Sequence, residues 1–169
     1  MVADFMTQAR RLLGGEVTAE KLEAVGRLLA NSSAEPGFVT EGEMQSLHGS
    51  ESSFTILQTD PDGLTLMLSR FSPDAPTPVH DHKSWGVACV VHGRDRYMHW
   101  EIAGDGGVRV LYEKELGPGS FVTWLGPPHD IHSQQGIDED AMELVLFGKN
   151  VTTIKRDYYD ASSGKPIKR

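Results

Sequence analysis

From Phe54 to the C-terminus, turn-forming residues divide the sequence into short apolar segments. The turn clusters are DPDG at 60–63, GDGG at 104–107, GPG at 117–119 and GPP at 126–128. Gly, Pro and Asp favour the backbone conformations of tight turns. The segments between the clusters are rich in β-branched and aromatic residues, and they read SFTILQT, LTLMLSRF, WGVACVVHG, RDRYMHWEIA, VRVLYEKEL, SFVTWLG, AMELVLFG and VTTIKRDYY. Eight or so short strands in succession are typical of an antiparallel barrel or jelly roll.

The N-terminal segment has a different periodicity. Apolar residues recur every three or four positions over 3–13 and 19–30, which predicts two helices. Thr18 is the expected N-cap of the second helix, because its hydroxyl can accept a hydrogen bond from a first-turn amide. We expect both helices to cover one side of the sheet. The whole chain, 1–169, is then one domain, with a helical segment at 1–36 and a β-barrel at 50–160.

Composition excludes some classes of partner. The formal net charge is −8, which disfavours binding to nucleic acid or to an anionic membrane. Cys89 is the one cysteine of the sequence, so no intrachain disulfide can form and a reducing compartment is expected. The N-terminus lacks the apolar stretch of a signal peptide, and a cytoplasmic location is the default expectation. Cys89 alternates with valines, which predicts an inert core thiol.

The stretch TPVHDHKSWGVACVVHGRD at 77–95 contains two histidines, His80 and His82. On a strand, side chains two residues apart share a face, so both imidazoles are expected to point the same way. Imidazole nitrogens are suitable ligands for Fe, Zn, Cu or Ni. By itself a His-x-His pair is more often two exposed or hydrogen-bonded histidines. Asp81, between them, is expected to face away and to bond a neighbouring strand or loop.

Two motifs in this part of the chain resemble those of the cupins. The first cupin motif has His-x-His, then Glu, then Gly; here His80 and His82 are followed by Gly86 in the Glu position and by Gly93. The second has Pro, Gly, His and Asn, and here Pro127, His129, His132 and Gly136 fall in that frame, with His132 in the ligand position. The resemblance implies a mainly β fold, a double-stranded β-helix (cupin or jelly-roll barrel) with the N-terminal helices packed against it.

Within the cupins, the chain is similar to the thiol dioxygenases, of the cysteine dioxygenase and 3-mercaptopropionate dioxygenase type. TPVHDHKSWG, DIH and FGKNVTTIKRDYYD carry this similarity, which extends from about 71 to 160. It implies that His80, His82 and His132 hold Fe(2+), although a three-imidazole site also accepts Ni, Zn or Cu. It also implies that O2 is added to the sulfur of a small mercapto acid to give a sulfinate, and that Arg156 binds the substrate carboxylate. The oligomeric expectation is a monomer or homodimer.

The chain departs from the family at a Ser-x-His-x-Tyr run that lies near the iron. Glu143, Val145 and Phe147 occupy these positions, so the polar groups that surround substrate in the family are lost. Three consequences are open: a different thiol is oxidised, another residue substitutes, or the site does not oxidise thiols. The candidate substitutes are Tyr97, Tyr158 and His129. Trp85 is a further candidate to line the pocket, although large aromatic residues commonly fill barrel interiors.

Two other functions are compatible with the same residues. A metal-binding cupin without oxidative activity would bind a small anion, as a sensor or storage protein. A Zn- or Ni-dependent lyase or isomerase would keep catalysis and change the reaction. Metal analysis separates these alternatives in part, since iron favours oxygen chemistry and zinc favours Lewis-acid chemistry.

Overall fold

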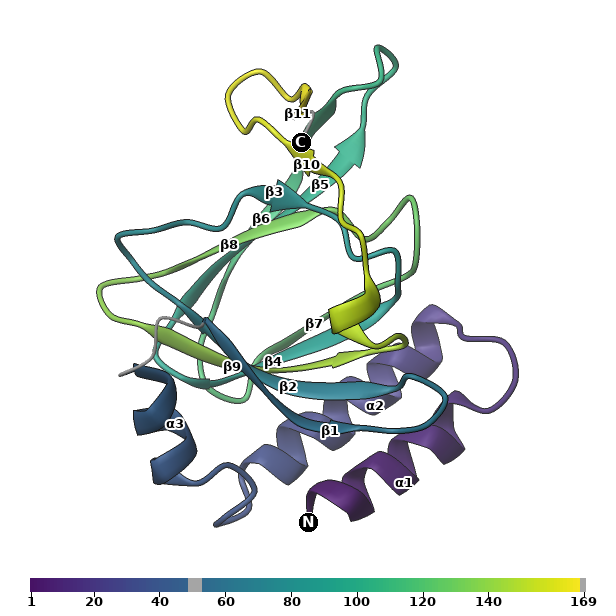
Figure 1. The fold of residues 1–169 in the computed structure, drawn as a ribbon, viewed down its shortest axis with the longest axis vertical. Helices are drawn as coiled ribbons and strands as arrows, with labels where there is room; N and C mark the ends of the chain where they lie inside the picture. Colours follow the sequence, from purple (N-terminus) through teal and green to yellow (C-terminus); the bar gives the residue numbers. More distant parts are fainter. Residues whose placement is uncertain (49–52, 168–169) are drawn as a thin grey trace.

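Two antiparallel sheets face each other in the computed structural model, which describes residues 1–48 and 53–167 (Figure 1). One sheet has the order β1 (Phe54–Thr59), β2 (Thr65–Phe71), β9 (Ala141–Phe147), β4 (Gly86–His92) and β7 (Phe121–Trp124). The other has the order β11 (Pro166–Ile167), β10 (Tyr158–Tyr159), β3 (Val79–His80), β8 (His132–Gly136), β5 (Asp95–Ile102) and β6 (Val108–Leu116). Neighbours distant in sequence, such as β2 and β9, give the jelly-roll connectivity, and the predicted fold class is confirmed.

The five-stranded sheet is buried on both faces because its central strands are apolar on both sides. On β9, Met142, Leu144 and Leu146 belong to the core between sheet and helices. The alternating residues Val145 and Phe147 belong to the core between the two sheets. Since side chains alternate along a strand, one short sequence supplies both cores, and the inner face of this sheet forms a wall of the barrel interior.

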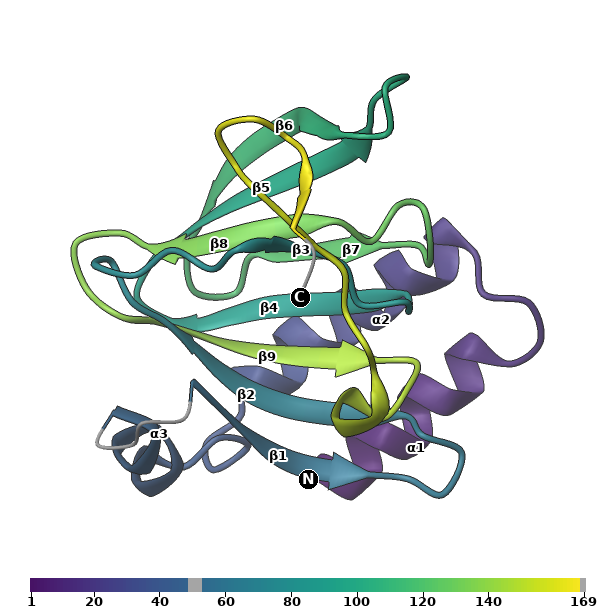
Figure 2. The ribbon, with the colours of Figure 1, turned by 45° about the horizontal axis from the view of Figure 1, so that its top comes forward.

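Helices α1 (Val2–Leu13) and α2 (Ala19–Ser33) lie against the outer face of this sheet (Figure 2). Both were predicted, and the Thr18 hydroxyl accepts a hydrogen bond from the Lys21 amide at 3.4 Å, as expected of an N-cap. Gly26 allows α2 to approach β7 closely, because a Cβ there would lie 2.3 Å from the Phe121 ring. No helix within 1–48 and 53–167 is long and apolar enough to cross a bilayer.

Several elements of the structure differ from those predicted from the sequence. The segment 151–159 was predicted as a strand, but it forms a 3₁₀ turn, η1 (Val151–Thr153), then an irregular stretch and the two-residue β10. The Asn150 side chain accepts a hydrogen bond from the Thr152 amide at 3.0 Å, which favours a turn over a strand. A third helix, α3 (Glu41–His48), and strands β8 and β11 were not predicted. The predicted start of the barrel, residue 50, lies outside the described residues.

Candidate metal centre and its cavity

His80, His82 and His132 come together inside the barrel. The Nε2 atom of His82 lies 3.1 Å from that of His80 and 2.9 Å from that of His132. One nitrogen from each of the three rings lies within 4.8 Å of the other two. Antiparallel pairing of β3 with β8 sets His80 opposite His132. All three side chains are buried, so the arrangement is a compact set of nitrogen donors that could hold one metal ion.

The geometric reason predicted for the His80–His82 pair is wrong. Strand β3 ends at His80, and His82 follows in an irregular segment, so the two rings do not meet through the alternation of one strand. Instead the Asp130 carboxylate accepts a hydrogen bond from the His82 backbone amide at 3.1 Å. This bond ties the segment after β3 to the loop before β8.

Asp81 faces away from the three histidines, as expected. Its carboxylate accepts a hydrogen bond from the Asp157 amide at 3.0 Å, and its own amide donates to the Asp157 carbonyl at 3.2 Å. Lys83 forms ion pairs with both Asp81 and Asp157. These contacts fasten the segment that carries Arg156 to the segment that carries His80 and His82.

The outer ring nitrogens of the histidines differ in their partners. His80 Nδ1 donates to the Pro78 carbonyl at 2.7 Å, which leaves the Nε2 lone pair facing the other histidines. His132 Nδ1 lies 3.4 Å from the Tyr97 hydroxyl, a buried group that orients this ring. His82 Nδ1 is buried without a hydrogen-bond partner in the described part of the chain. A hydrogen-bond partner on the ring nitrogen that points away from the metal, as His80 and His132 have, is usual for metal-ligating histidines.

The electrostatic environment keeps these imidazoles uncharged. Burial lowers the pKa of His80 to about 4, with a smaller contribution from Arg156. Burial, and then the neighbouring histidines, hold the pKa values of His82 and His132 well below 6.5. At neutral pH all three rings are neutral, the form that binds metal. Converging, neutral nitrogens with no competing donor between them fit a borderline divalent ion such as Fe, Zn, Cu or Ni.

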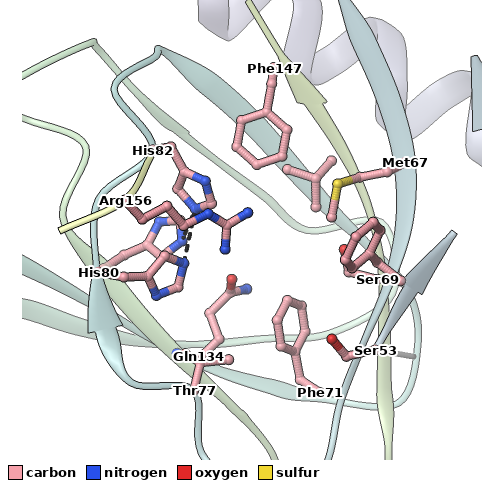
Figure 3. Close-up of a pocket in the computed structure, with 13 residues that line it drawn as sticks. Ser53, Met67, Ser69, Phe71, Thr77, His80, His82, Gln134, Phe147 and Arg156 are labelled. Carbon is pink, nitrogen blue, oxygen red and sulfur yellow. Dashed lines mark hydrogen bonds between the residues drawn. The ribbon is translucent and has the colours of Figure 1, made fainter. Parts of the chain in front are cut away.

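A cavity of about 120 Å³ opens beside the three histidines (Figure 3). Its volume is well below the roughly 300–1,000 Å³ of pockets for drug-sized ligands, so it fits a small molecule. Aromatic and aliphatic side chains make up much of the wall. The lining residues are Ser53, Phe54, Met67, Ser69, Phe71, Thr77, His80, His82, His132, Gln134, Val145, Phe147 and Arg156.

Arg156 reaches into this cavity beside the histidines (Figure 3). It comes from the irregular stretch between η1 and β10, which Asp81 and Lys83 hold in place. Burial lowers the pKa of the guanidinium, which nevertheless stays charged at neutral pH. No side chain among residues 1–48 and 53–167 forms a hydrogen bond or ion pair with it. An unpaired, half-buried arginine favours an anionic ligand.

The residues in the Ser-x-His-x-Tyr frame divide into two groups. Val145 and Phe147 line the cavity, and the Phe147 ring lies 4.5 Å from the His82 ring, centroid to centroid. Glu143 does not line it. Glu143 is fully buried one layer behind, where Gln134 Nε2 donates to its carboxyl at 2.7 Å. The β9 side of the cavity is therefore apolar.

Other predicted residues lie away from the cavity. His129 is exposed in the loop between β7 and β8, and it lines a separate hollow with His99 and Tyr112. Trp85 packs in the core between helices and sheet. Trp124, from β7, instead contacts the site: its ring lies edge-on to that of His132, at 5.0 Å between centroids. Cys89 is buried as expected, and burial raises its pKa to about 11.

Sequence reasoning missed two polar residues that line the cavity. Gln134 lines the cavity, and its Nε2 donates both to Glu143 and, at 3.2 Å, to Asp95. Its position two residues after His132 on β8 places it on the same face, which is the signal that could have found it. Ser69, opposite Glu143 on β2, also lines the cavity, and its hydroxyl lacks a partner within the described residues.

Burial also changes the ionisation of the two carboxyl groups behind Gln134. It raises the pKa of Asp95 to about 6. Burial and the nearby Asp95 charge raise the pKa of Glu143 well above its usual value. Both shifts favour the protonated carboxyl, and a protonated Glu143 can donate a hydrogen bond to the Asp95 carboxylate.

Comparison with known proteins gives similarity in structure only. No family model and no curated protein matches the sequence. Among solved structures, oxalate oxidase is similar over 63% of this chain and 56% of its own, at 14% identity and a TM-score of 0.47. A cupin-like protein from Thermotoga maritima matches over 65% of this chain and 77% of its own, at 18% identity and a TM-score of 0.46. A mutant of Bacillus subtilis oxalate decarboxylase matches over 53% of this chain and 22% of its own, at 24% identity and a TM-score of 0.42.

The chain thus spans little more than half the length of the oxalate oxidase it matches. The fold assignment rests on the two sheets and their strand order, and the candidate site rests on its own residues.

Proposed function

We propose that this chain is an iron-dependent, thiol-dioxygenase-like enzyme acting on a small mercapto acid. The observation that carries the proposal is that three converging neutral imidazoles face one small cavity together with Arg156, which has no side-chain partner among the described residues. The reaction is RS⁻ + O2 → RSO2⁻, in which sulfur loses four electrons, dioxygen gains them, and both oxygen atoms remain in the sulfinate.

His80, His82 and His132 are the residues that would hold the iron. Dioxygen by itself reacts slowly with thiolates. Bound iron(II) would supply the redox chemistry that adds dioxygen to the sulfur. His80, His82 and His132 are neutral, so they would leave the charge of a bound divalent ion undiminished, which would favour an anionic thiolate as ligand.

The chain's own residues would bind and orient the substrate. The Arg156 guanidinium offers a planar pair of N–H donors that matches a carboxylate. Phe71 and Phe147 line the cavity and limit the entry of water, which strengthens the attraction between the charged groups inside. A short mercapto acid therefore places its carboxylate at Arg156 and its sulfur at the histidines.

The apolar β9 wall favours a second candidate, a metal cupin that binds a small anion without oxidising it. Val145 and Phe147 offer no hydrogen-bond donor where the thiol dioxygenases have theirs. Gln134, on β8 of the other sheet, and Ser69, on the neighbouring strand β2, are among the polar groups that the chain provides instead.

Oxygen consumption by the iron-loaded protein tests the two candidates. We expect uptake and a stoichiometric sulfinate with at least one of 3-mercaptopropionate, cysteine and mercaptosuccinate. Saturable binding of these compounds without any sulfinate would support the non-oxidative alternative. Turnover of a non-thiol substrate by the zinc- or nickel-loaded protein, and none by the iron form, would support a lyase or isomerase.

A further inference from the structure

Gln134 is held by two buried carboxyl groups that the proposed reaction does not use. Its Nε2 donates to Glu143 at 2.7 Å and to Asp95 at 3.2 Å. Asp95 and Glu143 are both completely buried, and the backbone amide of Gln135 donates to the second Asp95 oxygen at 3.2 Å. The Gln134 backbone amide donates a hydrogen bond to the Thr77 hydroxyl at 2.8 Å.

These contacts determine which end of the Gln134 amide faces the ligand. A carboxamide has two N–H donors and one carbonyl oxygen. Both donors are directed at the carboxyl pair, since the pair's oxygens accept and would repel the amide oxygen. The oxygen, Oε1, is therefore left on the cavity side, with no donor in the described chain bonded to it. Figure 3 shows the amide end of Gln134 reaching into the cavity, into which Arg156 also reaches.

Two of the polar groups that line the cavity besides the histidines have opposite character. Arg156 is a cationic donor, and Gln134 presents a carbonyl acceptor, because its amide nitrogen donates to two buried carboxyl groups. Burial raises the pKa of Asp95 to about 6, and burial together with the Asp95 charge raises the pKa of Glu143 well above its usual value. An acceptor buried in a small cavity discriminates against ligands that leave it unpaired.

We propose that Gln134 determines specificity by selecting a substrate that donates a hydrogen bond. Resting on the function proposed above, this means a mercapto acid with a hydroxyl or ammonium group near its thiol and carboxylate. Asp95 and Glu143 are positioning residues that act through Gln134. The unsubstituted mercapto acid leaves Oε1 without a partner, and is the poorer ligand.

Anaerobic titration of the iron-loaded full chain tests this inference by binding alone. The probes are 3-mercaptopropionate, which has no such donor, and 3-mercapto-2-hydroxypropionate, which adds a hydroxyl. Calorimetry gives the two dissociation constants without turnover. We expect the wild-type protein to bind the hydroxy acid about tenfold more tightly, as one hydrogen bond in a desolvated site allows.

Two variants separate a role in specificity from one in structure. Gln134→Met keeps the side-chain volume and removes the acceptor, so the tenfold preference should fall to about one. Glu143→Gln resembles the protonated acid, since it can accept from Gln134 and donate to Asp95, and it should keep the preference. Metal content of both variants, measured in parallel, should match that of the wild type.

The outcomes divide clearly. Equal affinities in the wild-type protein, or no binding of either probe, would overturn the inference. A preference that persists in Gln134→Met would also overturn it, because the hydroxyl would then be recognised by the metal or another residue. If Gln134→Met does not fold, a loss of the preference in Glu143→Gln decides against the proposed orientation. A wild-type preference that Glu143→Gln retains, without sulfinate in air, supports the inference and contradicts the proposed oxidation.

Discussion

The two faces of the five-stranded sheet use the same strands for different purposes. The outer face presents side chains such as Leu66, Leu144 and Leu146 to the helices, and its core is almost entirely apolar. The inner face combines Val145 and Phe147 with Glu143 and Ser69. One face is built by apolar burial alone, while the other keeps polar groups at a cost in stability.

The distribution of unsatisfied atoms makes this contrast sharper. Among the described residues, the buried side-chain nitrogen and oxygen atoms without a hydrogen-bond partner are Ser69 Oγ, His82 Nδ1 and Glu143 Oε1. All three belong to the barrel interior at or behind the cavity. Buried polar atoms are nearly always paired in folded proteins. Their concentration here indicates that the barrel interior, which the inner face encloses, is arranged for a ligand, whereas the outer face is arranged for stability.

Removing a histidine should have the largest effect in the barrel interior, which the inner face helps to enclose. His82→Ala should abolish stoichiometric metal binding, because two imidazoles remain and one nitrogen donor is lost. The loss should exceed the roughly 10–100-fold that follows removal of an outer partner of a ligand. Metal analysis after iron loading and desalting measures it.

His129→Ala is the matched control for this change, since His129 is exposed and lines another hollow. It should retain full metal. Unchanged metal content in His82→Ala would show that the three histidines are not the site.

A substitution on the outer face should lower the free energy of unfolding and leave metal binding unchanged. Leu144→Ala removes a fully buried side chain between β9 and the helices, and should lower the free energy of unfolding by about 2–5 kcal/mol. Urea denaturation of the metal-free protein measures the change. The exposed Leu111→Ala should change stability by less than about 0.5 kcal/mol. Loss of metal from folded Leu144→Ala would break the proposed separation of the two faces.

This contrast also explains which features the sequence could predict. Alternation and turn residues identified most strands, the helical periodicity identified α1 and α2, and motif spacing identified His80, His82 and His132. Those signals are local. The strand predicted at 151–159 failed because the Asn150 side chain and the tie to Asp81 override the β propensity of the segment.

The cavity wall was harder to predict because it depends on pairing between distant strands. Whether Glu143 faces the ligand depends on Gln134 and Asp95, which lie on β8 and β5 of the other sheet. The register between Ser69 and Glu143 likewise joins residues 74 positions apart. No sequence window contains these partners, so the inner layer was found only in three dimensions.

Arg156 should affect ligand binding with little effect on metal. Arg156→Met keeps an apolar stem and removes the charge, and should weaken binding of 3-mercaptopropionate about 10- to 100-fold, or about 1.4–2.8 kcal/mol. Anaerobic titration of the iron-loaded variant measures this. Ethanethiol, which has no carboxylate, should bind equally well to both proteins. An equal loss for both thiols would contradict the assignment of Arg156 to the carboxylate.

The smallest effect concerns the cost of keeping acids inside the barrel. The folded-state pKa of Asp95, about 6, lies above its unfolded value of 3.8. Asp95 therefore favours the folded state fully below pH 3.8, and this contribution is lost as the pH rises through 6.

The variant Asp95→Asn removes this pH dependence, and its side-chain oxygen can still accept a hydrogen bond from the Gln135 backbone amide. Relative to the wild type, the variant should be more stable at pH 8 than at pH 5 by about 1 kcal/mol. Urea denaturation of both metal-free proteins at the two pH values measures the difference, and the uncharged neighbour Ser133→Ala should show no such change. A variant that loses relative stability at pH 8 would mean that the Asp95 charge stabilises the fold, and the inner face would then impose no electrostatic cost.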